Sequence, residues 1–164
     1  MPQENEDADG ADGDAGASLR FLFSELVRLE TELWDALEGR VRAEHGVTLP
    51  FFEFMQVISR NPECRVQDIA DELGITVGGT SKIVDRIEAA GYCLRHANPR
   101  DRRSSIIRLT PAGARLLTQL TATVDDELRA RLGSLPHRSL ARLAKTLTAL
   151  RTAVRSAEVG KKTA

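Results

Sequence analysis

Apolar residues recur every three or four positions between Leu19 and Val41, the spacing of a long amphipathic helix. A second, shorter helix is predicted over "PFFEFMQVIS", which has proline in its first turn and is followed by "NPE". Two more long helices are predicted near the C-terminus. One starts at "TPAG" and carries an apolar stripe to Leu132, and the other follows Pro136 and runs to Val154. The chain is therefore expected to be mainly α.

The middle of the chain predicts two short helices separated by a tight turn. In "RVQDIADELGI" the apolar residues share one side, and Gly74 suits a helix C-terminus. Thr76 can cap the next helix, whose apolar side centres near Ile83 and Ile87 and which ends at Gly91. Two helices joined by a glycine-containing turn are typical of a helix-turn-helix.

Beyond this pair the hydrophobic period changes to that of strands. Apolar runs in "YCLRHA" and "SSIIRL" flank the turn-forming, charged "NPRDRR", which predicts a two-stranded ribbon with a basic tip. A ribbon placed directly after a helix-turn-helix makes a winged helix, so we expect an α fold with a small β wing over residues 48–109. The long helices of residues 18–47 and 110–157 carry more apolar surface than one chain can cover. They predict a helical dimerisation domain, followed by a tail at 158–164.

Two glycines near the start of the second helix of this pair need an explanation. Gly78 and Gly79 each disfavour helix by up to about 1 kcal/mol relative to alanine. At 100° per residue, Gly78 faces away from the apolar side, together with Ser81, Lys82 and Arg86. A bare helix N-terminus can approach DNA closely, and its free N–H groups can bind phosphate oxygens. The alternative is that the glycines belong to the turn and the helix starts at Ser81.

The charge distribution also favours DNA. The formal net charge is -1, but residues 1–17 hold six acidic groups and no Lys or Arg, so the remainder carries +5. Residues 76–108 alone hold seven basic and three acidic groups. A local positive patch is the electrostatic footprint expected of a nucleic-acid partner. Residues 1–17 are expected to form a disordered acidic arm.

Other classes of function find little support. The aromatic content of 4% leaves few stacking platforms for single strands. No apolar run suggests a signal peptide or a membrane span, so a cytoplasmic protein is expected. Phosphate loops, nucleophile elbows and paired metal-binding histidines are missing from the sequence, so neither an enzyme nor a cofactor or metal is predicted. Cys64 and Cys93 are expected to be packed or half-buried thiols, with a redox sensor as the alternative.

Two motifs carry a resemblance to a known family. The segment "DRRSSIIRLTPAG" resembles the wing and following helix of MarR-family transcriptional regulators, in the pattern Asp-x-Arg followed by Leu-Thr-x-x-Gly, and "IVDRIEAAGYCLR" is similar to the end of the family's recognition helix. The resemblance covers roughly residues 19–155. It implies a homodimer whose recognition helices enter successive major grooves while the wings reach the minor grooves. It also implies that Arg103 is the minor-groove arginine and that Asp101 positions the wing by pairing with an arginine.

The predicted DNA-binding residues come from the recognition helix and the wing. The family usually has side chains at the positions of Gly78 and Gly79, and these glycines cannot contact bases through a side chain. Ser81 and Lys82 are therefore expected to contact the bases. Thr80 and Arg86 are expected to be structural or phosphate-bound. Part of the specificity would then come from groove shape. The full set is Thr76, Gly78, Gly79, Thr80, Ser81, Lys82, Arg86, Arg100, Asp101, Arg102 and Arg103.

The resemblance also implies a response to a small molecule. Members of the family commonly bind small aromatic or anionic effectors between the dimer helices and the winged helix. Here the predicted lining is Trp34, His45, Phe51 and Phe54, and the alternative is that these aromatics are core. The sequence thus predicts a dimeric regulator of an inverted-repeat operator on double-stranded DNA, acting as a repressor that the effector releases. The alternatives are an architectural or protein-binding winged helix and a thiol-based redox sensor.

Overall fold

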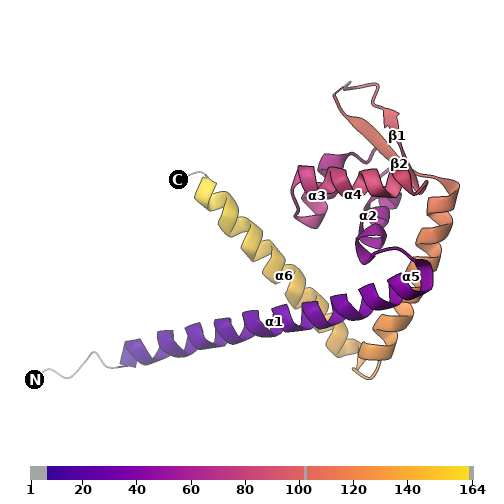
Figure 1. Cartoon of the computed structure of the whole chain (residues 1–164). Helices are drawn as coiled ribbons and strands as arrows, with labels where there is room; N and C mark the ends of the chain where they lie inside the picture. Colours follow the sequence, from indigo (N-terminus) through magenta and orange to yellow (C-terminus); the bar gives the residue numbers. More distant parts are fainter. Residues whose placement is uncertain (1–6, 102, 163–164) are drawn as a thin grey trace, which may run out of the picture. The chain divides into compact units, whose positions relative to one another are not determined.

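The computed structural model describes residues 7–101 and 103–162 (Figure 1). The fold is mainly α with one small antiparallel sheet, which confirms the expected fold class. In chain order its elements are α1 (Asp7–His45), α2 (Leu49–Arg60), α3 (Val66–Leu73), α4 (Val77–Ala89), β1 (Cys93–Ala97), β2 (Ser105–Leu109), α5 (Pro111–Leu132) and α6 (His137–Lys162).

The chain divides into two compact units. Residues 1–127 contain α1 to α4, the two strands and most of α5, whereas residues 128–164 contain the end of α5 and α6. The winged helix lies entirely within the first unit. The functional boundaries drawn from the sequence, 48–109 for DNA binding and 18–47 with 110–157 for dimerisation, stay predictions.

The helix α2 supplies the centre of the core. Its apolar residues cover most of its circumference and leave a polar stripe of Glu53, Gln56 and Arg60. This helix contacts α1, α3, α4 and β2, whose residues Val41, Ile69, Ile87 and Ile107 have 0% exposure, as has Leu120 of α5. The buried residues of α2 itself are Leu49, Phe51, Phe52, Phe54, Met55, Val57 and Ile58.

The helix-turn-helix forms where the sequence predicts it. Gly74 ends α3 in the left-handed conformation, with φ of 69°, and its N–H donates to the carbonyl of Ala70. Thr76 caps α4, because its hydroxyl oxygen accepts the N–H of Gly79. The two helices are in direct contact, and α4 follows the turn immediately (Figure 1).

The wing is joined to α5 by a close approach of two backbones. The strands β1 and β2 pair antiparallel, with Cys93 opposite Leu109. At their base the Thr110 hydroxyl donates to the Gly91 carbonyl at 2.7 Å and accepts the Gly113 N–H at 3.0 Å. A Cβ atom on Gly113 would lie 2.0 Å from the carbonyl oxygen of Tyr92. The Leu-Thr-x-x-Gly pattern therefore has a local packing reason.

Both ends of the chain differ from expectation. The helix α1 begins at Asp7, inside the segment expected to be a disordered arm, and residues 1–6 lie outside the described residues. Extending an existing helix fixes one residue for each hydrogen bond gained, whereas starting a new helix fixes several residues for the first bond. The free-energy cost of extending α1 toward the N-terminus is therefore small. Likewise α6 continues through most of the expected tail to Lys162, and residues 163–164 are outside the described part.

Candidate nucleic-acid interface

Both glycines of the recognition helix lie inside its first turn. Since α4 begins at Val77, the alternative start at Ser81 is wrong. A Cβ atom on Gly79 would approach the hydroxyl oxygen of Thr76 at 3.1 Å, so the cap itself favours glycine there. A Cβ atom on Gly78 would meet nothing within 4 Å. No internal contact among the described residues therefore calls for glycine at position 78, and this position is exposed.

Two of the residues predicted to contact DNA have roles within the protein: Thr76 caps α4, and Thr80 lies on its buried side. Thr76 is exposed, but its hydroxyl oxygen is bonded to the Gly79 N–H at 3.2 Å. Thr80 has 0% exposure, and its hydroxyl donates to the Thr76 carbonyl at 2.9 Å. Of the two roles expected for Thr80, structural or phosphate-bound, its burial supports the structural one and corrects its place among the DNA contacts. Val84 follows Thr80 by four residues and Ile87 follows it by seven, so all three side chains lie on the same, buried side of the helix.

The outward side of α4 presents two cations. Lys82 is exposed and forms no ion pair with any described residue, so its ammonium group can meet an anion from outside. Arg86 is also exposed, and its guanidinium carbon lies 5.8 Å from the centre of the Phe51 ring. That distance is within the range of a cation–π contact, which steadies the arginine stem against α2. Ser81 is half-buried.

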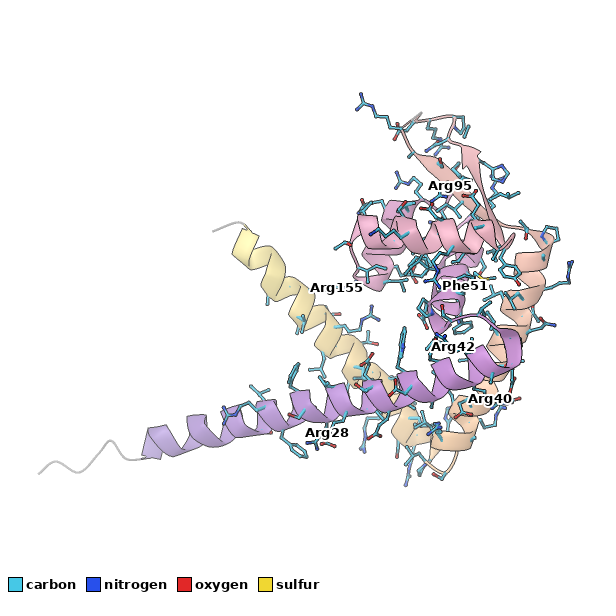
Figure 2. The ribbon with its side chains drawn as sticks, in the orientation of Figure 1. Arg28, Arg40, Arg42, Phe51, Arg95 and Arg155 are labelled. Atoms are coloured by element: carbon cyan, nitrogen blue, oxygen red, sulfur yellow. The ribbon has the colours of Figure 1, made fainter. Side chains whose placement is uncertain are left out.

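An ion-pair cluster ties the wing to the recognition helix. From β1, Arg95 reaches both Asp85 and Glu88 of α4, with 2.7 Å between its Nη2 and Asp85 Oδ1. The Arg95 N–H also donates to Glu88 Oε1 at 2.9 Å. Figure 2 shows Arg95 on the wing, next to α4. The positive charge of Arg95 is thus balanced by two carboxylates of the protein. Arg95 therefore adds little to the basic patch predicted over residues 76–108.

The wing tip is shaped by hydrogen bonds between its side chains and backbone. The Arg103 N–H donates to Asp101 Oδ1 at 2.9 Å, and the Arg100 N–H donates to Asn98 Oδ1 at 3.0 Å. Asp101 thus holds the backbone of Arg103. Asp68 is the main cause of the raised pKa of Arg65, and the charge of Asp101 adds to it. The implied pairing of Asp101 with an arginine side chain stays a prediction. A carboxylate that bonds to the N–H two residues later forms an Asx turn.

The arginines of the tip differ in their partners. Arg103 is exposed, and its guanidinium forms no ion pair with the described residues. Arg100 is paired with Glu63 of the α2–α3 loop at 3.2 Å, in an exposed contact that a phosphate could displace. Arg102 lies outside the described residues. Of the two tip arginines that the structure describes, Arg103 is consequently the one without an ion pair.

The predicted effector residues do not gather in one pocket. Phe51 and Phe54 are buried at 6% and 2% exposure, so they are core residues of α2. The His45 ring Nε2 is 2.8 Å from the Thr123 hydroxyl of α5. Trp34 lines a shallow hollow of about 260 Å³ on α1, together with Glu30, Thr31 and Asp35. The structure therefore corrects the assignment of Phe51 and Phe54 to a ligand lining.

The two thiols are in environments that keep them protonated. Both are fully buried, at 0% exposure. Burial, with some help from nearby carboxylates, raises the pKa of Cys64 to about 12 and that of Cys93 to about 11. The thiolate is the reactive form, so these cysteines lack the usual properties of a redox sensor.

We expect both thiols to resist alkylation in the native protein. At pH 8 iodoacetamide should label each cysteine at least about a hundredfold more slowly in the folded than in the urea-unfolded chain, because two pKa units remove that fraction of thiolate. Mass spectrometry of timed samples measures both rates. Rapid labelling of either cysteine in folded protein, accompanied by loss of DNA binding, would restore the redox-sensor alternative.

In the described part of the chain, neither a metal-binding group of side chains nor a membrane-spanning helix is found. Its His, Cys, Asp and Glu side chains form no group of three or more that could hold a metal ion. Among the helices of the described residues, none combines the length and apolar character needed to cross a membrane.

Comparison with known proteins bears on this geometry. Residues 47–105, which contain the helix-turn-helix and most of the wing, match the family model of the MarR family. The chain carries a MarR-family domain. This confirms the resemblance found in the sequence. Members of the MarR family are transcriptional regulators and not enzymes.

Relatives of the MarR domain agree with this assignment. A protein of Thauera aromatica described as a transcriptional regulatory protein for the hcr operon is 28% identical over 110 residues. That match covers 65% of this chain and 66% of the relative, slightly under two thirds of the relative's length.

Solved MarR-family structures show the same fold. A MarR/EmrR family regulator from Acinetobacter sp. ADP1 superposes with a TM-score of 0.76 at 22% identity, covering 84% of this chain and 96% of that one. CouR from Rhodococcus jostii RHA1, solved with p-coumaroyl-CoA, gives a TM-score of 0.69 at 21% identity and covers 76% and 87% of the two chains.

Proposed function

We propose that this protein is a cytoplasmic, dimeric regulator that binds an inverted-repeat operator on double-stranded DNA. The observation that carries the proposal is the outward side of α4 with the adjoining wing. There Gly78 has no side chain, and neither Lys82 nor Arg103 forms an ion pair with any described residue. Backbone N–H groups of a first helical turn bind phosphate oxygens well. Arginine is favoured in a narrow minor groove because of its negative potential.

The proposed homodimer is supported by uncovered apolar surface. On α1, the side chains of Leu19, Phe21 and Phe23 are 66%, 68% and 68% exposed. On α6, Val154 is 62% exposed. Apolar residues at this density on long helices are typical of a protein interface. A two-fold dimer would read half-sites about one helical turn, roughly 34 Å, apart.

We further infer that the protein represses its operator and is released by a small aromatic or anionic effector. CouR, the structural neighbour solved with p-coumaroyl-CoA, shows that one protein of this fold accepts an aromatic ligand. In this chain Trp34 lies next to a hollow that also carries the carboxylates of Glu30 and Asp35. These negative charges favour a neutral or cationic ring, so this hollow supports an aromatic effector and not an anionic one. An effector acts by binding one spacing of the recognition helices better than the other.

Replacing Gly78 with alanine should separate folding from DNA binding. The added methyl group meets no protein atom, and alanine favours helix, so the free energy of unfolding should rise by up to about 1 kcal/mol. Affinity for duplex DNA should fall, because the methyl group holds the helix end away from the groove. Urea unfolding and fluorescence anisotropy of a labelled duplex measure the two effects.

Gly39 offers a matched control for this variant. It is also exposed within a helix, and its Cβ would likewise meet nothing within 4 Å. Gly39→Ala should therefore stabilise the protein to a similar degree and leave DNA affinity unchanged. If Gly78→Ala behaved in the same way as Gly39→Ala, the close approach of α4 to DNA would be disproved.

A further inference from the structure

The first turn of α4 presents a single exposed side chain beside its bare glycine. Gly78 and Gly79 have no side chains, and Thr80 is buried. Val77, the first residue of the helix, is 46% exposed. Any side-chain contact from this turn to a base edge must therefore come from Val77.

The chemistry of this side chain restricts what it can recognise. An isopropyl group neither donates nor accepts a hydrogen bond, so it gains nothing from a phosphate or from the polar atoms of a base. On the major-groove edges of the four base pairs, the C5-methyl group of thymine is the methyl group available for apolar contact. A recognition helix of a helix-turn-helix contacts base edges with its N-terminal residues.

We propose that Val77 contacts the C5-methyl group of a thymine in each half-site and is a specificity-determining residue of the interface. This inference rests on the proposed function as a regulator that binds duplex DNA. Gly78 contributes to it indirectly, because the absence of a Cβ atom on the outward side lets the backbone at Val77 come close enough for a short side chain to reach a base. Ser81, one turn later on the same side, is half-buried and leaves this approach open.

Exposed apolar residues elsewhere provide controls. Single exposed apolar side chains are ordinary on protein surfaces, and exposure alone does not distinguish Val77. Leu94, on β1, is 49% exposed, which is nearly the same as Val77. It lies outside the first turn of α4, so it should not read thymine. Leu94→Ala is therefore the matched truncation.

The test removes each side of the proposed contact in turn: the C5-methyl group of thymine in the DNA, and the Val77 side chain in the protein. An operator duplex is first recovered by the full-length protein from a random pool. Duplexes are then synthesised in which single thymines of both half-sites are replaced by deoxyuridine, which lacks only the C5-methyl group. Affinities of wild type, Val77→Ala and Leu94→Ala are measured by anisotropy at one stated salt concentration, after circular dichroism has confirmed that each variant is folded.

At one thymine position per half-site, wild type and Leu94→Ala should lose affinity on deoxyuridine substitution by about fourfold per half-site, or about 15-fold for both, the effect of burying one methyl group. Val77→Ala should bind the two duplexes within about twofold of each other. Equal sensitivity of wild type and Val77→Ala at every thymine, or no sensitivity in wild type, would overturn the role of Val77 while leaving DNA recognition in place. Failure of the wild type to recover any operator would instead overturn the proposed function, and this inference with it.

Discussion

Replacing Gly113 with alanine should lower the free energy of unfolding by about 3 kcal/mol. The new methyl carbon would lie 2.0 Å from the Tyr92 carbonyl oxygen and 2.9 Å from the carbonyl carbon, distances that no side-chain rotation can relieve. The backbones at the base of the wing and the start of α5 must then separate, which is the kind of overpacking that carries the larger penalties. Urea unfolding followed by circular dichroism measures the loss.

The same substitution should disturb the wing as well as stability. The Thr110 hydroxyl bonds to both Gly91 and Gly113, so moving α5 pulls on the turn that leads from α4 into β1. DNA affinity of the folded fraction should therefore fall too. Gly39→Ala is the control, since its site has open space. An unchanged unfolding midpoint for Gly113→Ala would show that the two backbones are not in the contact described.

Replacing Arg103 with alanine should weaken binding to the operator by about tenfold or more near physiological salt. One charge contact with DNA contributes about 0.9 to the slope of log affinity against log salt, so the slope should become shallower by about one unit. A narrow minor groove adds to the loss, because its negative potential favours arginine. Anisotropy titrations over a series of salt concentrations measure the affinity and the slope together.

Arg28 provides the charge-matched control for this variant. It lies on α1, where its side chain is 73% exposed (Figure 2). Arg28→Ala removes the same charge and should leave both the affinity and the salt slope nearly unchanged. If Arg103→Ala and Arg28→Ala gave the same result, the wing would have no specific role in binding.

The local parts of the winged helix could be predicted from sequence because their signals are local. Gly74 and Thr76 mark the end of one helix and the start of the next through backbone conformation and capping, and both do so in the structure. The change from helical to alternating spacing after Gly91 located the wing. The 100° rule also placed Lys82 and Arg86 on an exposed side.

Contacts between distant segments could not be predicted in the same way. Periodicity places Phe51 and Phe54 on the broad apolar part of α2, but it cannot tell whether such a surface is core or the lining of a pocket. Arg95 looked like part of a basic patch because its partners, Asp85 and Glu88, meet it only after the chain has turned back into β1. The start of α1 at Asp7 depends on extension from a stable helix and not on the acidic composition alone.

Selection from a random DNA pool tests whether α4 and the wing recognise a specific operator. Purified full-length protein is mixed with random duplexes at a stated salt concentration near physiological, and the bound fraction is sequenced. We expect recovery of one inverted repeat whose half-sites are about one helical turn, roughly 34 Å, apart. Recovery of no motif by folded, dimeric protein would contradict it, and the winged helix would then be architectural or bind another protein.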